Sequence, residues 1–168
     1  MKLPRSPTAI VILSVVVVLL TYAVYLISSV PGTAGGPIPS GFSVGGSSFT
    51  FTYVATTEQE RETGLMNTKV TNSTTMLFAF PSLGRWQFYM YDTNTSLDML
   101  WVNATGDSGR VVYLVTGAEP CHTSADSCPR YTPNADANYV IEAKAGFASE
   151  HGVSVGTAIS FEEFQPEP

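Results

Sequence analysis

Basic residues are scarce in this chain of 168 residues. Of its eight Lys and Arg, six follow residue 30, where all fourteen Asp and Glu also lie. The part of the chain beyond residue 30 therefore carries a net charge of −8. Because nucleic acids and anionic lipid surfaces attract positive charge, this balance argues against nucleic acid as a partner and against docking on a lipid surface.

Two motifs that mark common hydrolases give no support for catalysis. The zinc pattern H-E-x-x-H does not occur in the sequence. The nucleophile pattern G-x-S-x-G occurs at 41–45 and 152–156, but neither copy runs from a predicted strand into a predicted helix, as a nucleophile elbow requires. Of the two histidines, His122 lies between the cysteines and His151 follows a predicted helix, where interaction with terminal carbonyls is commoner than catalysis. We therefore expect no metal, no cofactor and no assignable catalytic residue, and we favour a function without catalysis.

A run without charge fills residues 9–30, "AIVILSVVVVLLTYAVYLISSV". At about 1.5 Å per residue, a helix of this length spans the roughly 30 Å hydrocarbon core of a bilayer. Lys2 and Arg5 precede the run, and no basic residue follows before Arg61. The positive-inside rule then places residues 1–8 in the cytoplasm and everything after the span outside the cell membrane.

A cleaved signal peptide is the alternative, because small residues follow the run in "SVPGTAGG". The apolar region of a signal peptide is usually about 7–15 residues long, and this run is longer. A retained single-pass anchor is therefore favoured. Residues 31–47 are rich in Pro and Gly, and we expect them to tether the anchor to an extracytoplasmic domain over 48–168.

This location decides how the two cysteines are interpreted. Cys121 and Cys128 close a short loop, and a disulfide is the default outside the cytoplasm. Two alternatives remain: a zinc site, for which the loop offers one further ligand of the four needed, and a redox switch, although redox catalysts more often carry C-x-x-C. N-glycosylation acceptor patterns fit the same location and begin at Asn72, Asn94 and Asn103.

Short apolar segments predict the fold of the outer domain. Alternation over 49–54 predicts a half-buried strand. Thr57, with Glu60 three residues later, has the form of a capping box and predicts a short helix that ends at Gly64. A second short helix is predicted in 145–152. Further strands are predicted at 75–80, 86–91, 96–103, 110–116, 138–143 and 157–164.

Strands outnumber helices in this pattern, and the connections between them are short. No predicted helix is long enough to support a parallel crossover. We therefore predict a mainly β domain with two short helices, built as an antiparallel sandwich or a partly open barrel.

Five segments in a fixed order carry a resemblance to a known family: "ERETGLM" at 60–66, "MLFAFP" at 76–81, "LDMLWV" at 97–102, "CPRY" at 128–131 and "YVIEAKAGFASEHGVSVG" at 139–156. Together they resemble the domain-of-unknown-function family 192, small β-rich domains often found behind a signal or anchor. The resemblance covers roughly residues 48–164. It implies a compact β fold with short helices, and it implies no particular reaction or ligand.

One segment departs from the family pattern. Family members commonly read close to "FWMKNT" where this chain has "FYMYDT" at 88–93. Tyr91 takes the place of a basic residue and Asp92 that of an amide, so the local surface is more aromatic and more acidic. If the family binds an anion through that basic residue, this chain lacks the contact.

Arg61 and Asp98 are the charged candidates for a binding site. Arg61 can pair with its neighbours Glu58 and Glu62 at helical spacing. Its role is either that of an anion clamp or that of an ion pair that fastens the helix to the sheet, and the ion pair is favoured. Asp98 lies in a strand with two apolar faces, so we expect its carboxylate to be partly buried and hydrogen-bonded. A structural role is favoured for Asp98 over ligand binding or catalysis.

Tyr89 and Tyr91 are the aromatic candidates. Strand alternation sends Trp86, Phe88 and Met90 toward the core and the two tyrosines the other way. On that side they could line a contact surface for a carbohydrate or a protein.

The sequence thus favours a membrane-anchored extracytoplasmic domain that acts by binding, for example as an accessory subunit that holds a protein partner in a membrane or cell-surface complex. Two alternatives stay open. One is an enzyme on envelope glycan or peptide that uses Asp98 with Arg61 or a histidine. The other is a small-ligand carrier with a pocket near Tyr89 and Tyr91.

Overall fold

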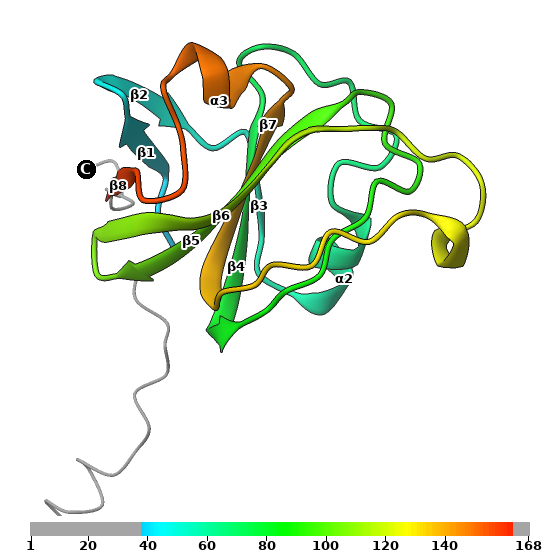
Figure 1. The fold of residues 1–168 in the computed structure, drawn as a ribbon, viewed down its shortest axis with the longest axis horizontal. Coiled ribbons are helices and arrows are strands. Elements are labelled where there is room, and N and C mark those ends of the chain that lie inside the picture. The colour runs from blue at the N-terminus through cyan, green and yellow to red at the C-terminus, as the bar shows by residue number, and fades with distance from the viewer. Residues whose placement is uncertain (1–37, 163–168) are drawn as a thin grey trace, which may run out of the picture. The chain divides into compact units, whose positions relative to one another are not determined.

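Eight strands pair into one sheet in the computed structural model, which describes residues 38–162 (Figure 1). Their order across the sheet is β2-β1-β8-β6-β5-β7-β4-β3. Every pairing is antiparallel except that of β3 with β4. The strands are β1 (Gly41–Val44), β2 (Ser47–Thr50), β3 (Tyr53–Ala55), β4 (Thr75–Gly84), β5 (Leu97–Thr105), β6 (Ser108–Ala118), β7 (Ala137–Lys144) and β8 (Ala158–Glu162).

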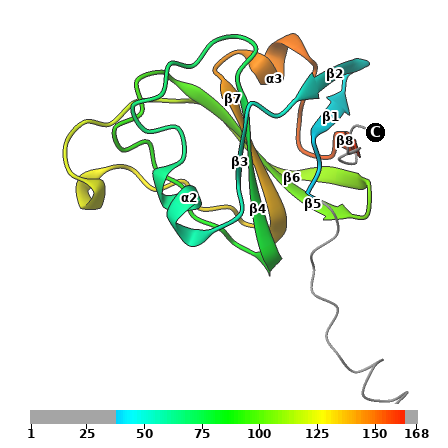
Figure 2. The same ribbon diagram turned by 180° about the vertical axis from the view of Figure 1, so that it is seen from behind.

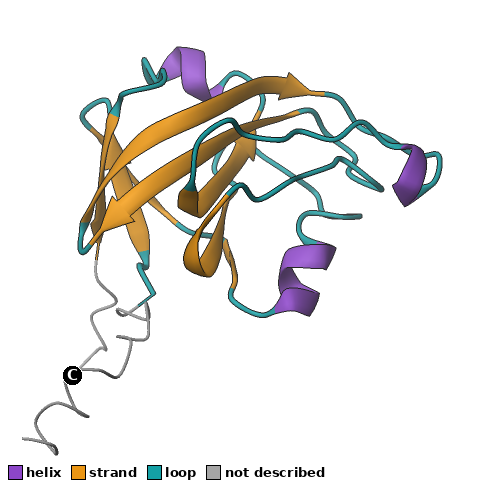
Figure 3. Ribbon diagram, turned by 60° about the horizontal axis from the view of Figure 1, so that its bottom comes forward, coloured by secondary structure: helices purple, strands orange, loops and turns teal. Residues whose placement is uncertain are grey.

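The sheet is strongly curled, as Figure 3 shows. Its two end strands, β2 and β3, are consecutive in the chain, and only Phe51 and Thr52 separate them. The three Cα–Cα steps from Thr50 to Tyr53 reach about 11 Å at most, so the two ends of an eight-stranded sheet must approach each other there. The mainly β prediction is confirmed. The sheet is one partly open curl, so the two-sheet sandwich is not the architecture.

Both faces of the central strands are apolar, as the alternation in 97–102 predicts. Leu97, Met99 and Trp101 of β5 belong to the core on one face. Leu100 and Val102 belong to the core on the other face. A fully apolar strand is expected where a sheet is covered on both sides.

Short helical segments lie around the sheet: α2 (Glu58–Thr63), the 3-10 turn η1 (Ala125–Ser127) and α3 (Phe147–Glu150). In Figures 1 and 2, α3 lies beside the β1–β2 hairpin and α2 lies beside β3 and β4. The predicted capping box of α2 is confirmed, and the helix ends at Gly64. Residues 56–74, which include this six-residue helix, form the crossover between β3 and β4. Their parallel pairing was not predicted from the sequence.

The sheet begins earlier than expected. The tether predicted for 31–47 overlaps β1, in which Phe42 and Val44 are buried. Gly45 and Gly46 have φ values of 59° and 79°, which a two-residue hairpin turn of this hand requires. The "VGGS" sequence is thus a hairpin signal. The hairpin was not predicted because the surrounding residues are rich in Gly and Pro, which is typical of a tether.

The strand predicted at 86–91 is wrong. This segment makes only isolated bridges, Phe88 with Tyr131 and Tyr91 with Cys121. Its partner segment, 119–133, contains three prolines. Because proline has no N–H to donate, a continuous ladder cannot form along such a partner.

The predicted anchor over 9–30 lies outside the described residues. Among residues 38–162, no helix is long and apolar enough to cross a membrane.

Candidate functional site

A pocket of about 340 Å³ lies between α2 and the sheet. Its lining comes from residues 58–66, from Phe78 and Phe80 of β4, from residues 86–93, and from Glu142 of β7. The volume lies near the lower end of small-molecule sites, which span about 300–1,000 Å³. Like many such sites, this pocket has aromatic walls and a few ionisable groups.

The first wall is α2, which the capping box holds in place. The Thr57 hydroxyl accepts a hydrogen bond from the Glu60 amide at 3.2 Å, and the Glu60 carboxylate accepts from the amides of Thr57 and Thr56 at 2.9 and 2.8 Å. These hydrogen bonds lower the pKa of Glu60 to about 2. None of the side chains of α2 itself is buried, so the wall depends on such terminal contacts.

Arg61 joins this wall to the sheet. Its Nη1 donates to the carbonyl oxygen of Thr56 at 2.5 Å and to that of Ala79 on β4 at 3.0 Å. The guanidinium also lies over the ring of Phe80, 5.0 Å from its centroid. Arg61 therefore fastens the helix to β4 and lines the pocket at the same time.

The predicted ion pair of Arg61 with Glu58 or Glu62 is absent. Both ion pairs of residues 38–162 lie elsewhere. Helix and sheet are connected by hydrogen bonds to backbone carbonyls instead. Glu58 and Glu62 line the pocket as exposed acidic groups.

The second wall is the segment 86–93, which brings Tyr89 and Tyr91 to the pocket. Both tyrosines are half-buried. Trp86 stacks on Phe80 of β4 with ring centroids 4.1 Å apart, and its Nε1 donates to the Ala137 carbonyl at 2.8 Å. The structure thus places Arg61, Tyr89 and Tyr91, three of the predicted binding residues, around one pocket.

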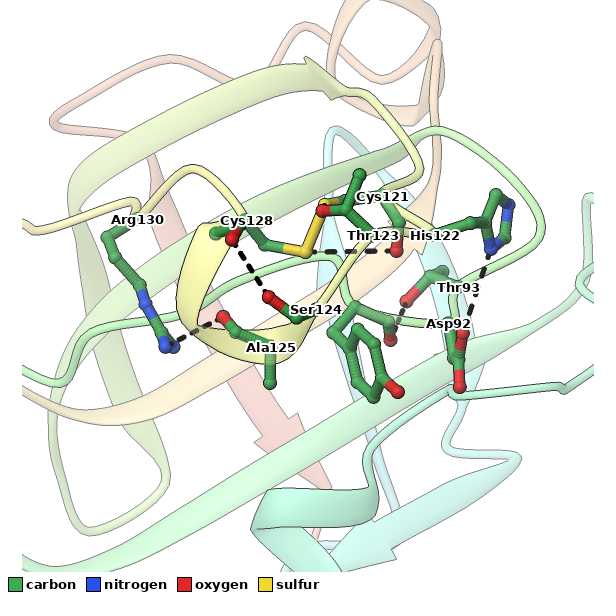
Figure 4. The surroundings of a disulfide bond; sticks show 11 residues. Asp92, Thr93, Cys121, His122, Thr123, Ser124, Ala125, Cys128 and Arg130 are labelled. Carbon is green, nitrogen blue, oxygen red and sulfur yellow. Dashed lines mark hydrogen bonds and ion pairs between the residues drawn. A yellow bond between two sulfur atoms is a disulfide. The ribbon is translucent and has the colours of Figure 1, made fainter.

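The disulfide loop supports this second wall. Cys121 and Cys128 are disulfide-bonded, as predicted (Figure 4). The Asp92 amide donates to the Cys121 carbonyl at 2.9 Å, and the Cys121 amide donates to the Met90 carbonyl at 3.0 Å. His122 lies 3.8 Å from Asp92, from Nδ1 to Oδ1. The loop therefore holds the backbone of the wall in position.

Glu142 is the ionisable group at the sheet side of the pocket. It is 4% exposed, and it pairs in register with Met76 of β4 and Met99 of β5. Its carboxyl group forms no hydrogen bond or ion pair within residues 38–162. Burial raises the pKa of Glu142 to about 8, so most molecules carry the neutral acid at pH 7.

Glu142 is not among the residues predicted from the sequence. Its signal is an acidic residue inside the apolar run "YVIEA". The same reasoning that singled out Asp98 applies to it, because a carboxyl group among apolar strand residues must be paired, neutral or functional.

Asp98 lies outside the pocket lining. It is 1% exposed. Its Oδ1 accepts from the Gly117 amide at 2.8 Å, and its Oδ2 accepts from the amides of Gly146 and Ala148 at 3.1 and 2.9 Å. Three backbone donors satisfy this carboxylate, which connects β5 to the end of β6 and to the start of α3. The geometry supports a structural role.

The glycosylation candidates lie on the surface to different degrees. Asn72 and Asn94 are exposed. Asn103 is half-buried, and its Nδ2 donates to the Asp136 carbonyl at 3.3 Å. As for metal binding, the described part of the chain contains no group of three or more His, Cys, Asp or Glu that could hold an ion.

The fold and the pocket define a small β domain with a cavity between α2 and the sheet. The chain belongs to the domain-of-unknown-function family 192, described as "Uncharacterized ACR", whose model matches residues 43–161. No curated protein matches the chain.

Two solved structures share the fold. One is a protein of Sinorhizobium meliloti 1021 described as a "putative transcription regulator", with 24% identity and a TM-score of 0.61 over 76% of this chain and 96% of that one. The other is a protein of unknown function from Novosphingobium aromaticivorans, with 22% identity and a TM-score of 0.60 over 76% of this chain and 94% of that one. At these identities, the likeness concerns the fold alone.

Proposed function

We propose that this protein is a membrane-anchored extracytoplasmic binding domain that takes up a small ligand in the pocket between α2 and the sheet. The observation that carries the proposal is Glu142, which is 4% exposed at a cavity of about 340 Å³ and whose carboxyl group has no partner among residues 38–162. No fully buried side-chain oxygen or nitrogen of those residues lacks a hydrogen bond, so the carboxyl oxygens of Glu142 are open to the cavity. A ligand in the cavity can supply the partner that the protein does not.

A purely structural role for Glu142 fits the contacts less well. Met76 and Met99, its register partners on both sides, are buried and apolar. A leucine or methionine at position 142 would pack there without the cost of desolvating a carboxyl group. The pattern resembles a binding site that trades stability for function.

Binding is also favoured over catalysis. The enzymatic alternative needs Asp98 together with Arg61 or a histidine. Asp98 is satisfied by three backbone amides on the other face of the sheet, and neither histidine lines the pocket. Arg61 and Glu142 do line it, but a single carboxyl group beside a guanidinium that is bound to backbone carbonyls does not define a reaction.

A screen of small compounds against the full chain in mild detergent tests the proposal. The compounds cover cations, anions and neutral molecules, and the readout is the melting temperature. We expect hits that stabilise the wild type and fail to stabilise Thr63→Trp, which fills the rim of the pocket from an exposed position. Thr105→Trp, at an exposed site at the end of β5, is the matched control. Binding in the pocket is refuted if no compound of any class distinguishes the two variants.

The anchor is the second part of the proposal, and the uncharged run over 9–30 and the disulfide support it. A domain held at the outer surface can pass its ligand to a membrane complex, in which it would act as an accessory subunit. External protease should digest the domain on intact cells. Protection in intact cells and digestion only after lysis would contradict the proposed topology.

A further inference from the structure

We infer that the ligand carries an organic ammonium group, which the pocket holds between its aromatic rings and the carboxylate of Glu142. This inference rests on the binding function proposed above and names the chemistry of the ligand. It is drawn from the charges, the rings and the unpartnered carboxyl group of the pocket.

The charges of the lining favour a cation. Glu58, Glu62 and Glu142 contribute three carboxyl groups, whereas Arg61 contributes one guanidinium. The Nη1 of Arg61 already donates to two backbone carbonyls. An anionic ligand would therefore meet the acidic side chains of Glu58 and Glu62 and one partly engaged guanidinium, whereas a cationic ligand meets carboxyl groups on two sides of the cavity.

The rings of the lining favour an organic cation. Six aromatic side chains line the pocket, and the face of an aromatic ring attracts positive charge. They are Phe78, Phe80, Trp86, Phe88, Tyr89 and Tyr91. Two of these rings already carry a cation: the guanidinium of Arg61 lies 5.0 Å from the centroid of Phe80, and that of Arg130 lies 4.2 Å from the centroid of Tyr89.

Glu142 supplies the counter-ion. In the free protein its carboxyl group is mostly protonated at pH 7, since burial raises its pKa to about 8. An ammonium ion beside it stabilises the carboxylate, so binding releases the proton of Glu142 to solvent and leaves an ion pair inside the pocket. No other reactant is needed to balance this step.

Few ionisable groups face Glu142. Along the sheet its neighbours are the apolar side chains of Met76 and Met99. The second wall contributes the phenols of Tyr89 and Tyr91. The other ionisable groups of the lining lie on α2, and they are Glu58, Arg61 and Glu62.

Three probes of similar shape and different charge test the inference by calorimetry on the full chain in mild detergent. Choline carries a positive head, 3,3-dimethylbutan-1-ol is its neutral analogue, and 3,3-dimethylbutanoate is a related anion. We expect choline to bind at least about tenfold more tightly than the neutral analogue, and the anion not to bind. Methylamine is a fourth probe and shows whether a methylated or a primary ammonium is preferred.

The pH dependence identifies Glu142 as the counter-ion. With a free pKa of about 8, the affinity for choline should rise about 50-fold from pH 6 to pH 8 and level off above that, as one-proton linkage requires. Close to one proton should be released per choline at pH 7. Glu142→Gln should lose both the pH dependence and the tight binding.

A second variant keeps the test valid if Glu142→Gln is poorly folded. Tyr91 is half-buried at the pocket wall, so Tyr91→Lys adds a cation there without disturbing the core. We expect it to weaken choline binding at least about tenfold more than it weakens binding of the neutral analogue, because only choline is repelled by the added charge.

The outcomes separate this inference from the proposed function. If the anion or the neutral analogue binds as well as choline, or if Glu142→Gln keeps the pH dependence, the ammonium assignment is overturned while pocket binding stands. If only compounds without an ammonium group bind and Thr63→Trp blocks them, the ammonium assignment is likewise overturned while pocket binding stands. If no compound binds at all, both proposals fail.

Discussion

Asp98 and Glu142 are two buried carboxyl groups one register step apart on opposite faces of the same sheet. Asp98 of β5 pairs with Ala143 of β7, and the next residue, Met99, pairs with Glu142. Asp98 accepts three hydrogen bonds from backbone amides, whereas Glu142 accepts none from residues 38–162. The two residues are therefore expected to behave in opposite ways when they are replaced.

Asp98→Ala should destabilise the domain by about 1–3 kcal/mol, because it leaves three backbone amides, that of the buried Ala148 among them, without their acceptor. Asp98→Asn should cost less. Its remaining oxygen can still accept from Gly146 and Ala148, so that only the contact with Gly117 is lost. Urea unfolding of both variants beside the wild type measures the difference. An unchanged midpoint in both variants would contradict the structural role of Asp98.

Glu142→Gln should make the domain more stable at alkaline pH. The folded pKa of Glu142 is raised from 4.5 to about 8, so the folded state binds its proton more tightly than the unfolded state. The stability contributed by that proton is fully present below pH 4.5 and is lost as the pH rises through 8. At about 1.4 kcal/mol per pKa unit, the whole effect is on the order of 5 kcal/mol.

The comparison of wild type and Glu142→Gln isolates this effect. Other carboxyl groups, such as Glu60 with its pKa of about 2, titrate in both proteins and cancel in the difference. Unfolding midpoints should be similar at pH 4 and should diverge steadily up to pH 9, with Glu142→Gln the more stable. Parallel pH profiles would show that the carboxyl group is not buried in solution.

The different fates of these two residues show what sequence patterns can predict here. Period-two alternation assigned Asp98 to an apolar strand, and a buried carboxylate there requires donors. The same pattern in "YVIEA" contains Glu142, but alternation does not indicate whether the donors exist. Those of Asp98 come from Gly117, Gly146 and Ala148, which lie 19 to 50 residues away.

The pocket was beyond sequence reasoning for a similar reason. No side chain of α2 is buried, so the helix has no apolar stripe that would indicate which of its faces packs on the sheet. Its contact with β4 runs from Arg61 to the carbonyl of Ala79, and a backbone carbonyl has no sequence signal. Residues 86–91 alternate like a strand. The prolines of the facing loop prevent a continuous ladder, so this segment forms a pocket wall instead of a strand of the sheet.

Loss of the disulfide should loosen this wall. The loop closed by Cys121 and Cys128 spans a separation of seven residues, for which chain entropy gives about 2.5 kcal/mol. The double variant Cys121→Ser and Cys128→Ser should lose about that much stability. Its midpoint in urea should not respond to reductant, whereas the wild type should fall to nearly the same value when reduced. A wild type that is indifferent to reductant would contradict a structural disulfide.

Thr57→Ala should open the first wall without unfolding the domain. The Thr57 hydroxyl accepts from the Glu60 amide, and loss of such a cap costs about 1 kcal/mol. Because no side chain of α2 is buried, that cost falls on the helix alone. Amide exchange at Arg61 and Gly64, which donate within the helix to Thr57 and Glu60, should quicken about fivefold while the melting temperature barely changes. Thr63→Ala is the control, since its hydroxyl only donates back to the Gln59 carbonyl. If exchange quickens equally across the sheet, α2 is not an independent wall but part of the cooperative core.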